Sequence, residues 1–533
     1  MGVPTRSVFG SLLVAAFTVV PLTSDGGQAE HAGTPLPVDS IEIVRHEVFD
    51  ESSTGISAPY RFGNTLHIQT RQSVVRRELL FTEGDVIDSE LVAQTERNLR
   101  ALPFLREARI DTIDLDADGD GLVDHVDVRV QVWDTWSLTP QLRFERFGDS
   151  SFWEVGAADT NLLGWGKHVS FTHQVTLDRS ANRFLYRDPQ LVGSRLALNV
   201  SAATLSDGDE GFVMLGRPFY SLDDSWAFAV RAAAFTRTDP LFKDGAEVTR
   251  LRHLSRGGDV ELARAFRRRS TSVLRVHVAY RTRNDQVDDT VRDFGIVEVG
   301  IRSVTHRFVQ LTHLNRFERT EDVNLGTQSY ASLGLSTPAL GGQPGQVAFV
   351  TAGYTRAAAF GPAHFLSGSL VASGRREHGV WTNVFGSTRV RYLRKHATRH
   401  LLIGSAHYRV GHNLDPEVQL LLGTESGLRG YPVRRFEGTR SLLLSAEERW
   451  FVVDDLAQLV SVGVAVFVDS GFAWPDGVGV ELRDLKTGVG GSVLLGSNRL
   501  SALPGVRLDL GYGINQVTNG GGWVFNALSR IEF

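Results

Sequence analysis

The sequence predicts a mainly β protein, a transmembrane antiparallel β-barrel preceded by one small α+β domain. Three observations lead to this prediction. Segments that alternate apolar and polar residues follow one another from about Ser137 onward, without a helical interlude. Such alternation places the apolar side chains on one face of each strand. A different pattern, which contains helices, occupies residues 40–135, and a short apolar run lies near the N-terminus.

Residues 1–29 have the three-part pattern of a secretory signal peptide. One basic residue, Arg6, precedes an apolar run from about Val8 to Leu22, and small residues then lead to Ala29. A membrane-spanning helix needs roughly twenty apolar residues, so this run is too short for one. A buried N-terminal helix is the alternative interpretation. We therefore expect an exported mature protein.

Residues 40–135 have the pattern of a compact α+β domain. Ser40–Phe49 is predicted to be a strand, and Thr70–Phe81 carries apolar residues at helical spacing. A second helix is predicted over Ser89–Phe104, with Asp88 as its N-cap. Two alternating segments follow and predict a β-hairpin. The order β-α-α-β-β is typical of a small α+β domain.

An acidic loop connects the two segments of this hairpin. Calcium binds to several oxygen ligands, and the glycine in the middle of the loop allows a sharp turn. The spacing is similar to that of EF-hand, dockerin and thrombospondin type-3 loops, so a structural calcium ion is one interpretation. A solvated acidic turn is the other. The candidate ligands are Asp116, Asp118, Asp120, Asp124 and Asp127.

Residues 137–533 are predicted to form the barrel. Val506–Ile514 and Val460–Asp469 each carry apolar residues on one face, and Leu442–Trp450 places Glu447 on the opposite, more polar face. A soluble β-sandwich buries such an apolar face in a core, whereas a membrane barrel exposes it to lipid. The long uninterrupted series of strands favours the barrel. Direct counting yields roughly twenty candidate strands.

Glycine content and the C-terminal segment also favour a barrel. The 54 glycines lie largely on the polar faces, as expected for curved strands around a lumen. The segment Trp523–Phe533 alternates and ends on an aromatic residue, a familiar feature of bacterial outer-membrane barrels. We therefore predict that Phe533 is a C-terminal assembly signal.

The segment TESGLRGYPVRRFEG, Thr424–Gly438, is too long and too charged for a hairpin turn. A wide barrel would leak if its lumen were empty, so we expect this loop to fold inward. Its arginine then needs carboxylate partners, which suit the planar guanidinium. An extracellular loop in water is the alternative. The predicted residues are Arg429, Gly430 and Tyr431 in the loop, with Glu447 and Asp469 as partners on the barrel wall.

Other classes of function are less well supported by the sequence. The net charge of −5 gives no indication of nucleic-acid binding, and the absence of cysteine excludes thiolate-ligated metals. No G-x-S-x-G, P-loop or H-E-x-x-H motif occurs, so we do not expect an enzyme, although scattered catalytic residues would escape such a search. His396 and His400 lie in a predicted turn, where we expect no metal site.

Together these features resemble the BamA/TamA-type outer-membrane assembly and translocation family, in which POTRA domains precede a surface-antigen-type barrel. The segment FTEGDVIDSELVAQTERNLRALPFLREARI resembles part of a POTRA domain. Asn161–Lys167 and Arg217–Trp226 resemble family segments of the barrel. Leu428–Tyr431 resembles the family's arginine-glycine-aromatic loop motif, and Val466–Gly471 resembles its phenylalanine-x-aspartate-x-glycine signature.

The resemblance implies sixteen barrel strands, and we adopt this number in place of the direct count. It implies a bacterial outer-membrane location, with the N-terminal domain in the periplasm. The expected function is insertion of outer-membrane proteins or translocation of polypeptides, with lipid and client polypeptides as partners and no covalent cofactor. The chain has room for only one POTRA-like domain, which is a departure from BamA. A passive pore or nutrient receptor is the alternative function.

Overall fold

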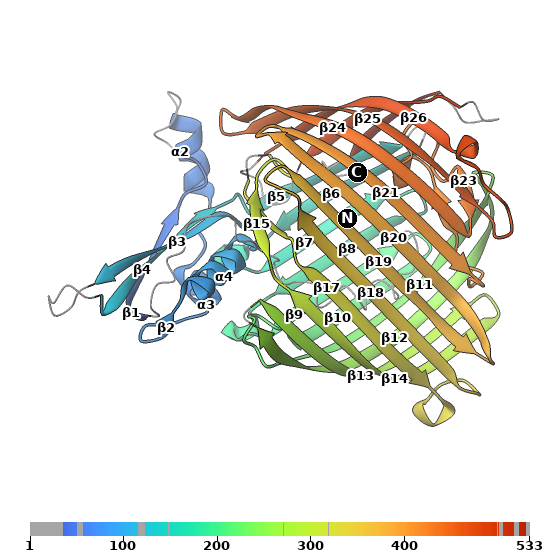
Figure 1. The fold of residues 1–533 in the computed structure, drawn as a ribbon, viewed down its shortest axis with the longest axis horizontal. Helices are drawn as coiled ribbons and strands as arrows, with labels where there is room; N and C mark the ends of the chain where they lie inside the picture. Colours follow the sequence, from blue (N-terminus) through green and yellow to red (C-terminus); the bar gives the residue numbers. More distant parts are fainter. Residues whose placement is uncertain are drawn as a thin grey trace.

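The computed structural model describes residues 36–50, 57–115, 123–147, 150–269, 271–317, 319–497, 499, 505–515 and 522–528. These residues form an N-terminal α+β domain and a closed antiparallel β-barrel beside it (Figure 1). The predicted signal peptide and Phe533 lie outside the described residues. None of the described helices is long and apolar enough to cross a membrane.

The N-terminal domain has a four-stranded sheet in the order β2-β1-β4-β3, with helices packed against it. Strand β1 runs parallel to β4, and β3 pairs with β4 in the antiparallel sense. Helix α2 was not expected from the sequence. In chain order the elements are β1 (Leu36–His46), α2 (Ser57–Leu66), α3 (Gln72–Glu78), β2 (Val86–Ile87), α4 (Ser89–Arg100), β3 (Leu105–Leu115) and β4 (His125–Asp134).

Helix α4 shows how the local sequence sets an element's bounds. Asp88 is its N-cap, and the Asp88 side chain accepts a hydrogen bond from the backbone N–H of Leu91 at 2.8 Å. The predicted cap is therefore correct. The helix ends at Arg100, earlier than Phe104, because Pro103 disfavours helical geometry at the residue before it. The apolar face of α4 joins the buried core of the domain.

The barrel consists of twenty strands among the described residues, closed by pairing between β28 and β5. Its strands are β5 (Leu138–Phe147), β6 (Ser150–Asp159), β7 (His168–Val175), β8 (Ser180–Asp188), β9 (Ala197–Leu205), β10 (Gly208–Arg217), β11 (Trp226–Lys243), β12 (Ala246–Arg269), β13 (Ser272–Val287), β14 (Thr290–Thr305), β17 (Thr327–Ser336), β18 (Val347–Ala359), β19 (His364–Glu377), β20 (Val380–Ala397), β21 (His400–His412), β24 (Arg440–Leu456), β25 (Val460–Trp474), β26 (Lys486–Gly496), β27 (Val506–Gly513) and β28 (Trp523–Leu528).

The expectation of sixteen strands, taken from the family resemblance, is wrong. The direct count of roughly twenty alternating segments agrees with the structure. Each alternating segment pairs with both neighbours, and this includes the short strands β7 and β8, of 8 and 9 residues. A strand left out of the ladder would leave exposed backbone donors and acceptors at an edge, so each segment of this kind adds a strand to the wall.

Two small hairpins and several short 3-10 turns are not part of the barrel wall. The hairpin β15–β16 follows β14, and the hairpin β22–β23 lies in the connection between β21 and β24. These elements are β15 (Phe308–Leu311), β16 (Glu321–Asn324), β22 (Leu420–Leu422), β23 (Phe436–Gly438), η1 (Leu162–Gly164), η2 (Leu191–Gly193), η3 (Pro338–Leu340), η4 (Thr424–Ser426) and η5 (Leu482–Asp484).

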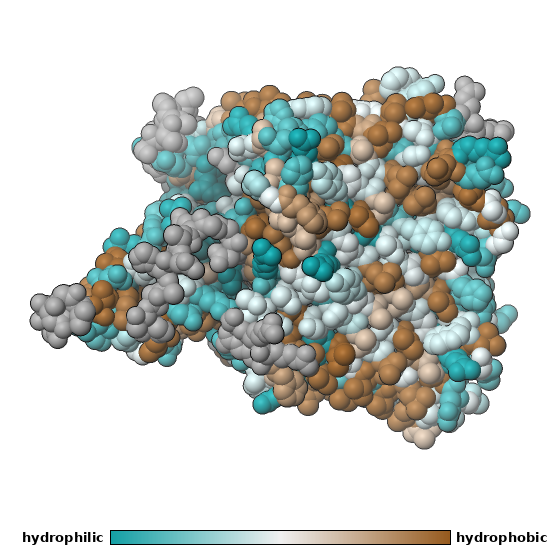
Figure 2. Space-filling view, in the orientation of Figure 1, coloured by the Kyte–Doolittle hydropathy of each residue, from teal (hydrophilic) through white to brown (hydrophobic). Residues whose placement is uncertain are grey.

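The barrel has inverted polarity relative to a water-soluble domain. On β25, the outward residues Val464, Val466 and Val468 are 38–52% exposed. Inward-facing charged residues such as Arg507 and Asp509 on β27 are 0% exposed. Figure 2 shows hydrophobic side chains spread over the barrel wall and hydrophilic ones over much of the N-terminal domain. An apolar outer face and a polar lumen are the arrangement that a lipid surrounding requires.

The N-terminal domain is docked on turns at one end of the barrel. Asn161 Nδ2 donates a hydrogen bond to Thr70 Oγ1 at 2.8 Å. Arg100 on α4 reaches Asp322 of β16, with its Nε 3.1 Å from Asp322 Oδ2. Arg499 Nη1 donates to the carbonyl oxygen of Val48 at 2.7 Å. The domain is thus attached through polar contacts at several points around the barrel mouth.

Candidate functional site

The connection between β21 and β24 contains the long charged loop singled out in the sequence. Its hairpin β22–β23 and turn η4 surround Leu428 and Tyr431, which are both 0% exposed. These two side chains form a small core with Leu422, Phe436 and Ala473. Ala473 belongs to barrel strand β25, so the loop is packed against the inside of the wall.

Arg429 lies between two carboxylates of the barrel wall. Its Nε and Nη2 donate to Asp469 Oδ2 and Oδ1 at 2.6 and 2.8 Å, which makes a bidentate pair. Its Nη1 donates to Glu447 Oε2 at 2.7 Å. The guanidinium also lies over the ring of Phe467, 3.5 Å from the centroid. Arg429 is 1% exposed, and Glu447 and Asp469 are 5% and 0% exposed.

Two further arginines complete this charge network. Arg507 Nη1 and Nη2 donate to Glu447 at 2.8 and 2.7 Å, and Arg449 Nε donates to the same carboxylate at 2.6 Å. Arg507 also donates to Asp509 at 2.6 Å. Each of these buried charges therefore has an opposite charge beside it, as buried ions require. The sequence argument did not assign roles to these arginines, although alternation placed Arg507 and Asp509 on a polar face.

Gly430 allows the loop backbone to contact the wall. Its φ is +95°, a left-handed conformation that favours glycine. A Cβ at this position would lie 2.8 Å from the backbone nitrogen of Gly513 and the carbonyl carbon of Tyr512, both on β27. The neighbouring Tyr431 hydroxyl donates to the carbonyl oxygen of Thr487 on β26 at 3.0 Å. The loop therefore has contacts with successive barrel strands.

The structure describes only part of the acidic loop, but it describes both histidines of the β20–β21 turn. Asp116, Asp118 and Asp120 lie outside the described residues, so the calcium interpretation stays a prediction. Asp124 begins the return to β4, and Asp127 on that strand accepts a hydrogen bond from Ser40 Oγ at 2.6 Å.

At the β20–β21 turn, the structure adds a third possible ligand to the two histidines. His396 Nε2 lies 3.3 Å from Glu448 Oε1, and the ligand atoms of His396, His400 and Glu448 all lie within 4.8 Å of one another. The sequence did not indicate this glutamate because it lies on β24, which the fold brings alongside the turn.

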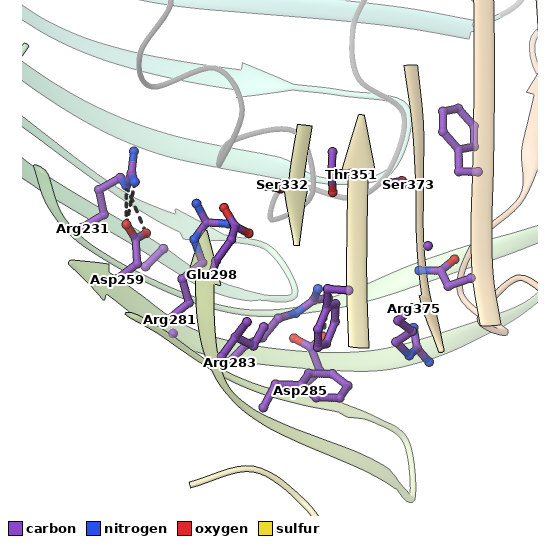
Figure 3. A pocket seen from close by; sticks show the side chains of 18 of the residues that line it. Arg231, Asp259, Arg281, Arg283, Asp285, Glu298, Ser332, Thr351, Ser373 and Arg375 are labelled. Carbon is purple, nitrogen blue, oxygen red and sulfur yellow. Dashed lines mark hydrogen bonds and ion pairs between the residues drawn. The ribbon is translucent and has the colours of Figure 1, made fainter. Parts of the chain in front are cut away.

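A cavity of about 710 Å³ occupies another part of the lumen. Its lining includes many arginines and carboxylates of β11 to β14 and of the segments that follow, together with apolar and small residues (Figure 3). Many of these side chains are paired. Arg231 contacts Asp259 on the neighbouring strand, and Arg281 donates to Glu298 at 2.6 Å. The lumen thus contains a cavity with many charged groups in its wall beside the loop, large enough for many water molecules.

These features define a class: a closed barrel with an apolar outer face, an inward-folded loop held by ion pairs, and a small domain at one mouth. No protein-family model matches the chain, and no curated protein matches it.

Three solved structures are similar to parts of the fold. BamA from Haemophilus ducreyi lacking POTRA domains 1-3 has a TM-score of 0.41 and 10% identity, covering 93% of this chain and 85% of that chain. CdiB from Acinetobacter baumannii has a TM-score of 0.44 and 11% identity, covering 92% and 73%. Pseudomonas aeruginosa OccK11 (OpdR) has a TM-score of 0.33 and 10% identity, covering 73% and 93%. Similarities at this level do not define a function.

Proposed function

We propose that this protein is an outer-membrane β-barrel that acts on polypeptides, either inserting other barrel proteins into the membrane or translocating a secreted chain. The observation that carries the proposal is the loop held inside the lumen by Arg429, Glu447 and Asp469. A loop tethered in this way would restrict the free passage of small solutes through the lumen. The proposal involves no enzyme activity and no covalent cofactor.

The N-terminal domain supports a polypeptide as the substrate. Strand β3 has 11 residues and lies at the edge of its sheet, where β4 is its only partner strand among the described residues. An edge strand can add an extended chain by backbone hydrogen bonding. In β3 the N–H of Ile110 and the carbonyl oxygen of Ala108 are already bonded to Glu96 and Arg100 of α4, which limits such addition to the C-terminal half of the strand. We propose that this domain is POTRA-like, that it lies in the periplasm, and that it receives client segments beside the barrel mouth.

The proposal includes two alternative paths for the client polypeptide, one through the seam of the barrel and one through its lumen. In the first, β5 and β28 separate, and a client strand pairs with an edge so that its backbone groups stay satisfied in lipid. The described seam includes the partner pairs Asn526 with Phe147 and Ala527 with Arg146. In the second, the Arg429 loop moves aside and the client passes through the lumen.

Single-channel conductance in planar bilayers tests the plug. We expect a low, flickering conductance for the wild type and a higher one for Arg429→Ala and Asp469→Ala. Arg440→Ala is the matched control, because Arg440 pairs with Asp476 where the two side chains are 38% and 48% exposed. A large, steady conductance that neither variant changes would instead favour the passive pore or nutrient receptor.

A disulfide across the seam separates the two routes. The chain has no native cysteine, so Arg146→Cys with Ala527→Cys introduces a single pair at register partners. The assay is insertion of an unfolded outer-membrane protein into proteoliposomes, scored by protease protection. Loss of insertion under oxidising conditions, with recovery after reduction, supports the seam route. Protease protection that is unchanged under oxidising conditions supports the lumen route. If the wild type gives no protease protection of the client, the proposed function is contradicted.

A further inference from the structure

The arginines of the lumen cavity fall into two groups. Most have a carboxylate partner, so their charge is neutralised within the wall. This paired group consists of Arg231, Arg237, Arg281, Arg283, Arg292 and Arg375. Arg409 has no carboxylate partner among the described residues but donates to Ser441 Oγ and to the carbonyl oxygen of Leu421.

Arg275 and Arg302 form the second group. They are register partners on β13 and β14, and both line the cavity. Neither forms an ion pair with a carboxylate in the described part of the chain. Arg275 is 9% exposed and lies over the ring of Phe219 at 4.2 Å, and Arg302 lies over the ring of Tyr330 at 5.7 Å. Arg302 is partly exposed. Two adjacent cations, one buried and one partly exposed, repel each other unless an anion is present.

Two more nitrogen-bearing side chains extend this group toward the N-terminal domain. His306 follows the last residue of β14, and its ring lies 5.5 Å from that of Phe308. Arg97 of α4 lies over the same phenylalanine ring at 5.7 Å. The Nε atoms of Arg97 and Arg275 and the Nε2 of His306 are buried without a hydrogen-bond partner. We call Arg97, Arg275, Arg302 and His306 the mouth cluster.

The electrostatics indicate that these groups lie close together. Burial, together with the nearby guanidinium groups of Arg275 and Arg97, lowers the pKa of His306 to about 4. Burial also lowers the pKa of Arg97 to about 10. A bound anion would have the opposite effect on both groups. The site is therefore electropositive and partly dehydrated, which strengthens its attraction for a negative charge.

The carboxylates nearest to the mouth cluster already have other partners. Asp322 accepts hydrogen bonds from Arg100 at 3.1 and 3.2 Å. Asp224 accepts from Arg217 at 2.9 Å. Glu261 is ion-paired with Arg231. Asp224 and Glu261 therefore act on Arg275 and Arg302 only from beyond ion-pair distance.

We propose that the mouth cluster binds a carboxylate of an extended polypeptide as it enters the lumen. This inference rests on the proposed function and adds a specificity for acidic segments. Guanidinium groups suit a carboxylate, and the aromatic rings on which they lie help to hold them in position. A lipid phosphate does not fit, because the two strand arginines face the lumen while Val299 and Ile301, 50% and 51% exposed, face outward.

Peptide binding to the purified full-length protein in nanodiscs tests this inference. The probes are a labelled unstructured peptide with two glutamates, its glutamine-substituted counterpart, and inorganic phosphate. We expect the glutamate peptide to bind at least about ten-fold more tightly than the glutamine peptide in fluorescence anisotropy. Arg275→Gln combined with Arg302→Gln removes this difference.

Arg283→Gln is the control, because Arg283 is on the same strand and lumen face but is paired with Asp285. It should retain the preference, and Arg275→Lys should retain part of it because the positive charge remains. Thermal unfolding confirms that each variant is folded.

Three other outcomes would overturn the inference. If both peptides bind equally to the wild type and to the double variant, the carboxylate site is refuted while polypeptide binding stands. If inorganic phosphate binds as tightly as the glutamate peptide, the cluster is a small-anion site. If neither peptide binds the wild type, the proposed function fails together with the inference.

Discussion

Strand β4 of the N-terminal domain and strand β25 of the barrel carry nearly the same sequence pattern, with valine at every second position. In β4 these valines face inward, and Val126, Val128, Val130 and Val132 are 0–4% exposed. In β25 the valines face outward. The aspartate at the end of the opposite face, Asp469, is 0% exposed.

This difference shows that alternation defines two faces of a strand but does not decide which one is buried. The valines of β4 meet apolar residues of α3 and α4, so hydrophobic burial orients the strand. Asp469 of β25 forms an ion pair with Arg429, and this ion pair offsets the cost of burying the polar face in the lumen. The outward valines then require an apolar solvent. The predictions below test the two regions in turn.

The largest effect is expected in the N-terminal domain. Val130→Asp places a carboxylate in a site that is 0% exposed, and it should cost about 5 kcal/mol, enough to unfold the domain. Limited proteolysis of the full chain should then cleave the domain while the barrel stays resistant. Val86→Asp is the control, because Val86 is 59% exposed and its replacement should change stability by less than about 0.5 kcal/mol. Equal resistance in both variants would contradict the assigned core.

Within the barrel, Arg429→Ala should cost about 3–5 kcal/mol because Glu447 and Asp469 remain buried with less positive charge beside them. Urea unfolding in lipid vesicles, followed by tryptophan fluorescence, measures this loss. Arg440→Ala removes an exposed pair and should cost at most about 1 kcal/mol. Similar costs for the two variants would show that the Arg429 network is hydrated and weak.

The outer face of β25 can be tested with Val466→Arg. Val466 is 52% exposed, so the change should be tolerated in water, whereas in a bilayer it should cost about 2–4 kcal/mol if the position lies near the midplane. Val466→Leu is the control and should leave stability nearly unchanged. Unfolding in vesicles is the measurement, and an unaltered free energy for Val466→Arg would show that this face does not contact lipid.

An effect of pH on stability is expected at the junction between domain and barrel, where Glu78 is buried. Burial raises the pKa of Glu78 to about 8, although Arg195, Gln190 and Arg77 oppose the shift. The folded state therefore holds a proton that the unfolded state releases near pH 4.5. Stability is highest below this pH and falls by up to about 1.4 kcal/mol per pH unit until about pH 8.

Glu78→Gln should flatten this pH dependence, as measured by unfolding of the full chain between pH 5 and pH 8. Glu83→Gln is the control, because hydrogen bonds lower the pKa of Glu83 and its ionisation does not change in that range. If the wild type and Glu78→Gln show the same slope, Glu78 is ionised in the folded protein.

Much of the fold was predictable because it depends on local patterns. The N-cap at Asp88, the β3–β4 hairpin and the two faces of the barrel strands follow from neighbouring residues. The direct strand count was also sound, and it became wrong only when the family resemblance replaced it. Helix α2, Ser57–Leu66, was missed although its amphipathic pattern is about as strong as that of α4, which was predicted.

In the candidate site, too, some residues were predictable from local patterns and others were not. Alternation placed Glu447 and Asp469 on polar faces, and the unusual loop identified Arg429 as the cation in need of partners. The roles of Arg507 and Glu448 depend on strands that are distant in the chain. The mouth cluster depends on both the β13–β14 register and the docking of α4.

The sequence by itself determined which residues share a face, where strands turn, and that one charged loop does not fit a turn. These properties depend on the period of the backbone and on the chemistry of adjacent side chains. Only the tertiary structure decided which face is buried and how Arg429 contacts its two carboxylates. It also decided that Arg275 and Arg302 form no ion pair with a carboxylate of the described residues. Those outcomes depend on distances between strands far apart in the chain, because the interaction of charges is set by their separation and burial.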